Sequence, residues 1–121
     1  YENVSVFNRS KKVINIDGIN KYTKDYSLIN LYLVNSDLII NTTPTNPLNK
    51  KQISFIKKTT IISDIVYQPR ETTFLKKFKL NKKIYGISML IEQALPCFKQ
   101  WFGFVPVVDD ALIKKLNKKI K

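Results

Sequence analysis

The sequence contains no histidine, one cysteine and three glycines among 121 residues. Without histidine, the chain lacks the most common acid–base side chain at neutral pH and the most common metal ligand, so no metal site is predicted. The single cysteine, Cys97, excludes an internal disulfide and indicates a reducing compartment, which we expect to be the cytoplasm. Because glycine occurs only at Gly18, Gly86 and Gly103, the chain has no Gly-rich loop to hold a pyrophosphate.

Long hydrophobic runs are also missing. No apolar stretch approaches the roughly 20 residues that a membrane span requires, so no membrane partner is expected. The first residues show no basic and apolar pattern of the kind that a signal peptide has. With 44% hydrophobic and 25% charged residues, the composition is typical of one globular domain that covers residues 1–121.

Arginine is scarce, although the formal net charge is +12. Arg9 and Arg70 are the only arginines, and many of the lysines are spread along the chain in pairs. A helix that reads DNA concentrates arginine and amide side chains on one face, whereas dispersed lysine pairs are typical of solvated helix ends and loops. We therefore expect no nucleic-acid partner. A non-catalytic basic binding module remains the alternative from another class, and steeply salt-dependent DNA or heparin binding would distinguish it.

The apolar pattern predicts short strands that alternate with helices. Strands are predicted at residues 3–7, 38–40, 61–66 and 83–85, and helical segments at 27–34, 52–57, 73–80 and 88–103, with a last helix capped by Asp109. The apolar runs at 38–40 and 61–66 predict buried strands, the second buried on both faces. This alternation indicates an α/β fold with a largely parallel sheet.

Residues 88–103 carry the clearest helical pattern. Apolar side chains recur there at steps of three and four: Met89, Leu90, Ala94, Leu95, Phe98, Trp101 and Phe102. This spacing predicts a helix with one buried face, and Pro96 within it predicts a kink or a break. Gln93 lies beside that face, where a polar amide needs a partner. From the pattern alone, Gln93 either borders the core or contacts a ligand.

Polar and turn-forming residues follow the predicted strands at 8–10, 41–44, 64–67 and 86–89. In open parallel sheets, ligands bind beyond the carboxyl ends of the strands. These four segments therefore predict a binding site at that edge of the sheet.

Motifs in the same four places resemble those of the shikimate dehydrogenase family. They read Asn-Arg-Ser at 8–10, Asp-Leu-Ile-Ile-Asn-Thr-Thr-Pro at 37–44, Asp-Ile-Val-Tyr-Gln-Pro-Arg-Glu-Thr at 64–72, and Gly-Ile-Ser-Met-Leu-Ile-Glu-Gln-Ala at 86–94, followed by Trp-Phe-Gly at 101–103. The resemblance implies an incomplete Rossmann-like domain, a three-layer α/β fold with a parallel sheet. It implies an NADPH-dependent oxidoreductase that reduces 3-dehydroshikimate to shikimate in aromatic amino-acid biosynthesis. An NAD-preferring quinate/shikimate dehydrogenase is the alternative among enzymes.

The resemblance also implies site residues. The expected cofactor-binding residues are Asn8, Arg9, Ser10, Lys11, Lys12, Thr42, Thr43, Pro44, Ile65, Gly86 and Met89. Tyr67 and Gln93 are expected to hold the carboxylate and hydroxyls of the substrate. At the end of the second strand of a dinucleotide fold, an acid accepts the ribose hydroxyl of NAD, whereas Arg accommodates the 2′-phosphate of NADP. No acid lies between residues 3 and 16, and Arg9 offers a planar fork for a phosphate, so NADP is predicted.

The chain departs from the family pattern in several places. Asn46-Pro47 replaces a Gly-Met pair, and Ser88 replaces a glycine. The catalytic Lys and Asp of the family have no counterpart, so no catalytic residue is predicted in this chain. By resemblance the chain is the C-terminal part of a two-domain enzyme, and residues 88–121 close against a substrate domain that precedes it. The first strand of the cofactor domain is missing, which predicts exposed sheet edges at residues 3–7 and 38–41 unless another segment fills the gap. A homodimer is left open.

Overall fold

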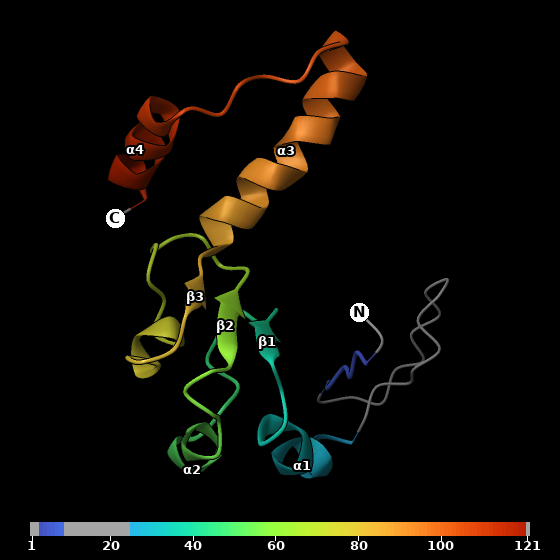
Figure 1. The fold of residues 1–121 in the computed structure, drawn as a ribbon, viewed down its shortest axis with the longest axis vertical. Coiled ribbons are helices and arrows are strands. Elements are labelled where there is room, and N and C mark those ends of the chain that lie inside the picture. The colour runs from blue at the N-terminus through green and yellow to red at the C-terminus, as the bar shows by residue number, and fades with distance from the viewer. Residues whose placement is uncertain (1–2, 9–24, 121) are drawn as a thin grey trace.

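The structure is a computed structural model that describes residues 3–8 and 25–120. Three parallel strands form its sheet in the order β1–β2–β3 (Figure 1). They are β1 (Leu38–Asn41), β2 (Ile61–Asp64) and β3 (Lys83–Ile84). The predicted parallel α/β fold is confirmed.

β2 is the central strand and β1 lies at an edge. Leu38 pairs with Ile61 in register, and Ile62 pairs with Lys83 on the other side. The side chain of Ile62 is fully buried, as predicted for a strand covered on both faces. The prediction that residues 38–40 form a buried strand is wrong in part, because Ile40 is 53% exposed. In the described part of the sheet β1 has a neighbour on one side only, which agrees with the predicted exposed edge.

Residues 3–7 do not form the predicted strand. Phe7 alone makes an isolated β-bridge, and residues 3–6 are irregular. A strand needs a ladder of hydrogen bonds to a neighbour, and a single bridge does not supply one. Phe7 is still held in place, because its ring packs edge-on against Tyr32 with the centroids 5.3 Å apart.

Short helical segments precede and follow the strands. They are the 3₁₀ turn η1 (Tyr26–Leu28), α1 (Ile29–Leu33), α2 (Lys50–Ser54), the 3₁₀ turn η2 (Leu75–Lys77), α3 (Gly86–Phe102) and α4 (Asp110–Lys119). The predicted helical turns at 27–34 are confirmed as η1 and α1. α2 begins two residues before the predicted start because Asn49 and Gln52 form a reciprocal capping box.

The predicted helical segment at 73–80 is reduced to the single turn η2. The Thr72 hydroxyl accepts a hydrogen bond from the Leu75 amide at the start of this turn, and Phe78 leaves the helical conformation at a ψ of 75°. One turn is sufficient to bury Phe74, Leu75 and Phe78, so the apolar spacing does not require a longer helix.

The core is small and lies between α1, the loop before α2, β2 and η2. Its buried apolar residues are Ile29, Leu33, Leu48, Ile62, Phe74, Leu75 and Phe78. Each such side chain contributes about 1.5–3 kcal/mol by leaving water. Through Ile62, Phe74 and Leu75 this core supports the carboxyl end of β2, where the predicted site begins.

α3 extends away from the sheet from the end of β3 (Figure 1). The prediction that its apolar face is buried is wrong: only Gly86 and Ile87 in the first turn are buried, while Trp101 is 71% exposed and Phe102 60%. An apolar helix face is covered only where another element packs on it, and the described part of the chain provides none along this face. The predicted break at Pro96 does not occur, because losing one backbone hydrogen bond does not end a helix with intact turns on either side.

α4 has the predicted cap and charge order. Asp109 accepts a hydrogen bond from the Leu112 amide at 2.7 Å, Asp110 lies in the first turn, and Lys118 and Lys119 lie in the last. The end of α4 is anchored by its backbone, since the Ile120 carbonyl accepts a hydrogen bond from the Arg70 amide at 3.1 Å. Within residues 3–8 and 25–120, no helix has both the length and the apolar character needed to cross a bilayer.

Candidate functional site

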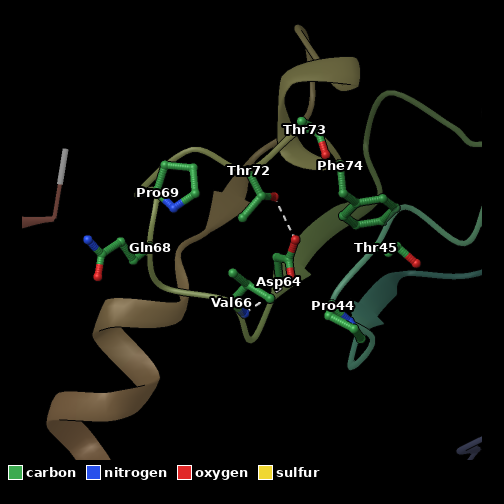
Figure 2. A pocket seen from close by; sticks show the side chains of 9 residues that line it. All are labelled: Pro44, Thr45, Asp64, Val66, Gln68, Pro69, Thr72, Thr73 and Phe74. Carbon is green, nitrogen blue, oxygen red and sulfur yellow. Dashed lines mark hydrogen bonds between the residues drawn. The ribbon is translucent and has the colours of Figure 1, made fainter.

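Polar loops gather at the carboxyl ends of β1 and β2, as the sequence predicts. A pocket of about 140 Å³ opens between them (Figure 2). Its lining residues are Pro44, Thr45, Asp64, Val66, Gln68, Pro69, Thr72, Thr73 and Phe74. Asp64 lies near the centre of this view, between the loop after β1 and the turn after β2.

The loop after β1, residues 41–45, is folded around the buried side chain of Asn41. The Asn41 amide nitrogen donates to the carbonyls of Thr43 and Thr45, both at 3.1 Å. The Asn41 amide oxygen accepts from the backbone amide and the hydroxyl of Thr43, at 3.0 and 2.8 Å. This internal bonding occupies Asn41 and leaves Thr42 and Pro44 exposed on the loop. The loop therefore leaves Thr42 and Pro44 accessible at the carboxyl edge of the sheet.

The turn after β2 is closed by Asp64 and Thr72. Asp64 is 1% exposed, and its Oδ2 accepts a hydrogen bond of 2.6 Å from the Thr72 hydroxyl. Its Oδ1 accepts from the Val66 amide at 3.1 Å and from the Asn41 amide nitrogen at 3.3 Å. The same carboxylate thus contacts both loops. The sequence analysis did not assign a role to Asp64 or Thr72. Asp64 could have been found because it is a charged residue inside a strand that was predicted to be buried.

Tyr67 lies on the turn between those two residues and is 42% exposed. The turn contains a cis peptide bond between Gln68 and Pro69. The residues after this peptide bond, Arg70 and Glu71, contact Tyr85 and the β3 residue Lys83. The Arg70 guanidinium lies 4.9 Å from the centre of the Tyr85 ring. In addition, Glu71 and Lys83 form an ion pair.

The ion pair between Glu71 and Lys83 has an N–O distance of 2.5 Å. The hydrogen bond from the Lys83 ammonium lowers the pKa of the Glu71 carboxyl below its ordinary value. A carboxyl with a lowered pKa stabilises the fold above its ordinary pKa, and that contribution is lost as the pH falls. The residues after the turn are therefore tied to β3 at neutral pH.

Gly86 lies where α3 begins, against the chain leaving β2. A Cβ at this position would lie 2.5 Å from the Ile65 carbonyl oxygen and 2.6 Å from that of Val66. Real Cβ atoms do not approach a backbone oxygen so closely. Only glycine lets the first turn of α3 contact these carbonyls. The contact explains Gly86 structurally, and its predicted place next to a cofactor stays a prediction.

Some of the other predicted site residues lie at the carboxyl edge of the sheet, and others do not. Ile65 and Met89 are half-buried, one directly after β2 and the other in the first turn of α3. Gln93 lies one turn farther along α3 and is exposed, and its contact with a ligand stays a prediction. Asn8 is exposed. The predicted phosphate-binding residues Arg9, Ser10, Lys11 and Lys12 lie outside the described residues.

An open parallel sheet with helices between its strands and polar loops at its carboxyl end defines the Rossmann-like class of nucleotide-binding domains. No family model matches the chain. The chain is similar, however, to the curated shikimate dehydrogenase (NADP(+)) of Bartonella quintana, with 38% identity over 103 residues, and to that of Bartonella tribocorum, with 36% over 126 residues. These matches cover 76% and 93% of this chain but 35% and 43% of the relatives.

Among solved structures, the quinate dehydrogenase of Corynebacterium glutamicum in complex with NAD is similar, with a TM-score of 0.62 and 25% identity. The similarity covers 79% of this chain and 34% of that protein. The chain belongs to the shikimate dehydrogenase family. It spans less than half the length of the curated relatives named above.

Replacing Gly86 with alanine tests the contact between α3 and the end of β2. Alanine is intrinsically more favourable than glycine in a helix by up to about 1 kcal/mol. The clash with the carbonyls of Ile65 and Val66 opposes this gain and is expected to win, lowering the free energy of unfolding by about 1–3 kcal/mol. Denaturant unfolding measures the change. Ser88→Ala, an exposed position in the same turn, is the control and should be neutral or stabilising; equal effects of the two variants would contradict the contact.

Proposed function

We propose that this chain is the C-terminal part of an NADP-dependent shikimate dehydrogenase, an oxidoreductase of aromatic amino-acid biosynthesis that reduces 3-dehydroshikimate to shikimate. One observation carries the proposal: the loops of residues 41–45 and 64–72, which hold two family motifs, meet at one edge of the sheet through Asp64. The curated relatives that match the chain bear this activity and this cofactor in their names. We place the enzyme in the cytoplasm, in line with its single cysteine.

In this proposal the exposed Thr42 and Pro44, together with the half-buried Thr43 between them, line the nicotinamide half of the dinucleotide. Ile65, Gly86 and Met89 form the opposite wall, at the start of α3. The donor set fits a dinucleotide, since the loop after β1 offers polar groups and the start of α3 offers a close backbone approach. When bound, NADPH supplies the hydride that reduces the ketone carbon.

At the other end of the cofactor, Arg9 would bind the 2′-phosphate, helped by Asn8, Ser10, Lys11 and Lys12. Arginine forms two parallel hydrogen bonds to a phosphate and is always charged, which suits this role. The solved quinate dehydrogenase of Corynebacterium glutamicum was crystallised with NAD, so an NAD-preferring quinate/shikimate dehydrogenase remains the second candidate.

The chain's part in the reaction is to bind and orient the substrate. We propose that the Tyr67 hydroxyl and the Gln93 amide hold its carboxylate and ring hydroxyls, because both side chains are exposed on the side of the sheet where its strands end. The Lys and Asp that move the proton would come from the substrate domain, which by resemblance precedes this chain. Positioning alone does not transfer a hydride, so the chain by itself should be inactive.

The exposed apolar residues of the last third of the chain support a missing partner domain. They include Leu90, Phe98, Trp101, Phe102, Phe104, Val105, Val107, Leu112 and Ile113. Monomeric proteins seldom leave so many large apolar side chains on one segment in water. We propose that residues 88–121 close against the substrate domain. The missing first strand would likewise pair with the free edge of β1 and cover Ile40.

A chimera tests the proposed activity. The chain is joined to the N-terminal region of the Bartonella tribocorum relative, which would supply the pyrophosphate loop, the first strand and the catalytic pair. The folded chimera is expected to form NADPH from shikimate, and the 121 residues alone are expected to form none. A chimera that unfolds cooperatively but shows no turnover would contradict the proposal, and so would turnover by the 121 residues alone.

Arg9→Asp in the active chimera tests the choice of cofactor. The substitution replaces a side chain that donates hydrogen bonds to the 2′-phosphate with one whose negative charge repels it. The Michaelis constant for NADP should therefore rise by at least about tenfold while that for NAD changes little. Lys58→Asp makes the same change of charge at an exposed position before β2 and is the control. Equal losses for both cofactors would rule out contact with the 2′-phosphate.

Gln93→Ala tests the substrate contact. Losing one neutral hydrogen bond costs roughly 0.5–1.5 kcal/mol, so the Michaelis constant for shikimate should rise by up to about tenfold while that for NADP is nearly unchanged. Gln100→Ala removes an exposed glutamine near the far end of α3 and serves as the control. A lower melting temperature with unchanged substrate affinity would instead show that Gln93 is structural.

A further inference from the structure

We propose that Asp64 is a positioning residue that fixes the loop of residues 41–45 and the turn of residues 64–72 relative to each other. The proposal rests on the proposed function, which places the cofactor against the first and the substrate against Tyr67 on the second. Asp64 would touch neither ligand. It would set the distance between the two groups of residues that bind them.

The two carboxylate oxygens of Asp64 accept hydrogen bonds from both segments. Oδ1 accepts from the Asn41 amide nitrogen at 3.3 Å, and Asn41 in turn holds Thr43 and Thr45. Oδ2 accepts from the Thr72 hydroxyl at 2.6 Å, which closes the turn eight residues later. Figure 2 shows the Thr72 hydroxyl pointing at the Asp64 carboxylate. A single buried side chain therefore connects both walls of the pocket.

Thr72 connects Asp64 to the core residue Leu75. Its hydroxyl donates to Asp64 and accepts a hydrogen bond from the Leu75 amide at 3.2 Å. Leu75 is fully buried in the core. The far end of the turn is thus fixed to the core and to β2 at once, and Tyr67 lies between these two anchors. Removing the hydroxyl frees this end of the turn from Asp64 and also takes the acceptor away from the Leu75 amide.

The connection matters because the buried carboxylate is satisfied by donors from both loops. Within the described residues, it accepts hydrogen bonds from Asn41, Val66 and Thr72. A buried charge that loses a donor takes up another arrangement or draws in water, since leaving it unpaired is costly. Loss of the Thr72 donor would therefore move Asp64 and, through Asn41, the loop on the opposite side of the pocket.

The first measurement uses the chain itself. Thr72→Val keeps the shape of the side chain and removes the hydroxyl, which is both the donor to Asp64 and the acceptor from the Leu75 amide. Thr72→Ser keeps the hydroxyl, and Thr73→Val changes a neighbouring exposed position. Backbone amide NMR shifts should change in residues 43–45 and 66–70 for Thr72→Val, return close to the original for Thr72→Ser, and change only locally for Thr73→Val. Changes confined to residues 71–75 in Thr72→Val would overturn the proposal.

If Thr72→Val does not fold, the proposal is tested on the unmodified chain by hydrogen exchange. The Thr72 hydroxyl proton should then exchange slowly enough with water to be seen by NMR, as a proton held by a buried carboxylate does. Rapid exchange would overturn the proposal.

The second measurement uses the active chimera. Thr72→Val should raise the Michaelis constants for shikimate and for NADP together, each by at least about tenfold, well below the melting temperature, and Thr72→Ser should restore both. A loss of stability without a change in either constant, or a change in one constant alone, would overturn the positioning role. If the unmodified chimera is inactive, the proposed function fails, and the amide shifts still decide whether Asp64 connects the two loops.

Discussion

The buried carboxylate of Asp64 is the constraint on which the candidate site depends. It lies at the end of the central strand, where the chain turns away from the sheet, and it accepts hydrogen bonds from both neighbouring loops. A carboxylate removed from water must be satisfied by donors, and here the donors belong to segments far apart in the sequence. The requirement to satisfy one charge therefore determines the relative position of two loops.

The rest of the described structure is divided between a packed half and an open half. α1, β2 and η2 share a core that includes Leu33, Ile62 and Phe74. α3 and α4 contribute none of the residues of this core cluster, and most of their large apolar side chains are in contact with water. The packed half is the one that carries Asp64. The loops at the carboxyl edge are consequently supported even though the sheet has a free side at β1.

The open half agrees with membership of a family whose named relatives are more than twice as long as the matched region. Exposed apolar surface is stable in a folded protein only when a partner covers it or when the area is small. Trp101 and Phe102 are among the largest side chains of the chain and are mostly exposed. Their surroundings explain why helix periodicity predicted a buried face that this part of the protein does not bury.

Local patterns and motifs read along the chain were sufficient to predict the strands β1, β2 and β3, the cap of α4, and the family. The motif residues Thr42, Tyr67 and Gln93 were assigned in the same way, by resemblance. Only the folded structure could show that residues 3–7 form no strand, that residues 73–80 need one 3₁₀ turn, and that Gly86 is required by two carbonyls. It also revealed the contacts of Asp64. Burial and hydrogen bonding between distant segments depend on which groups meet in space, and periodicity does not contain that information.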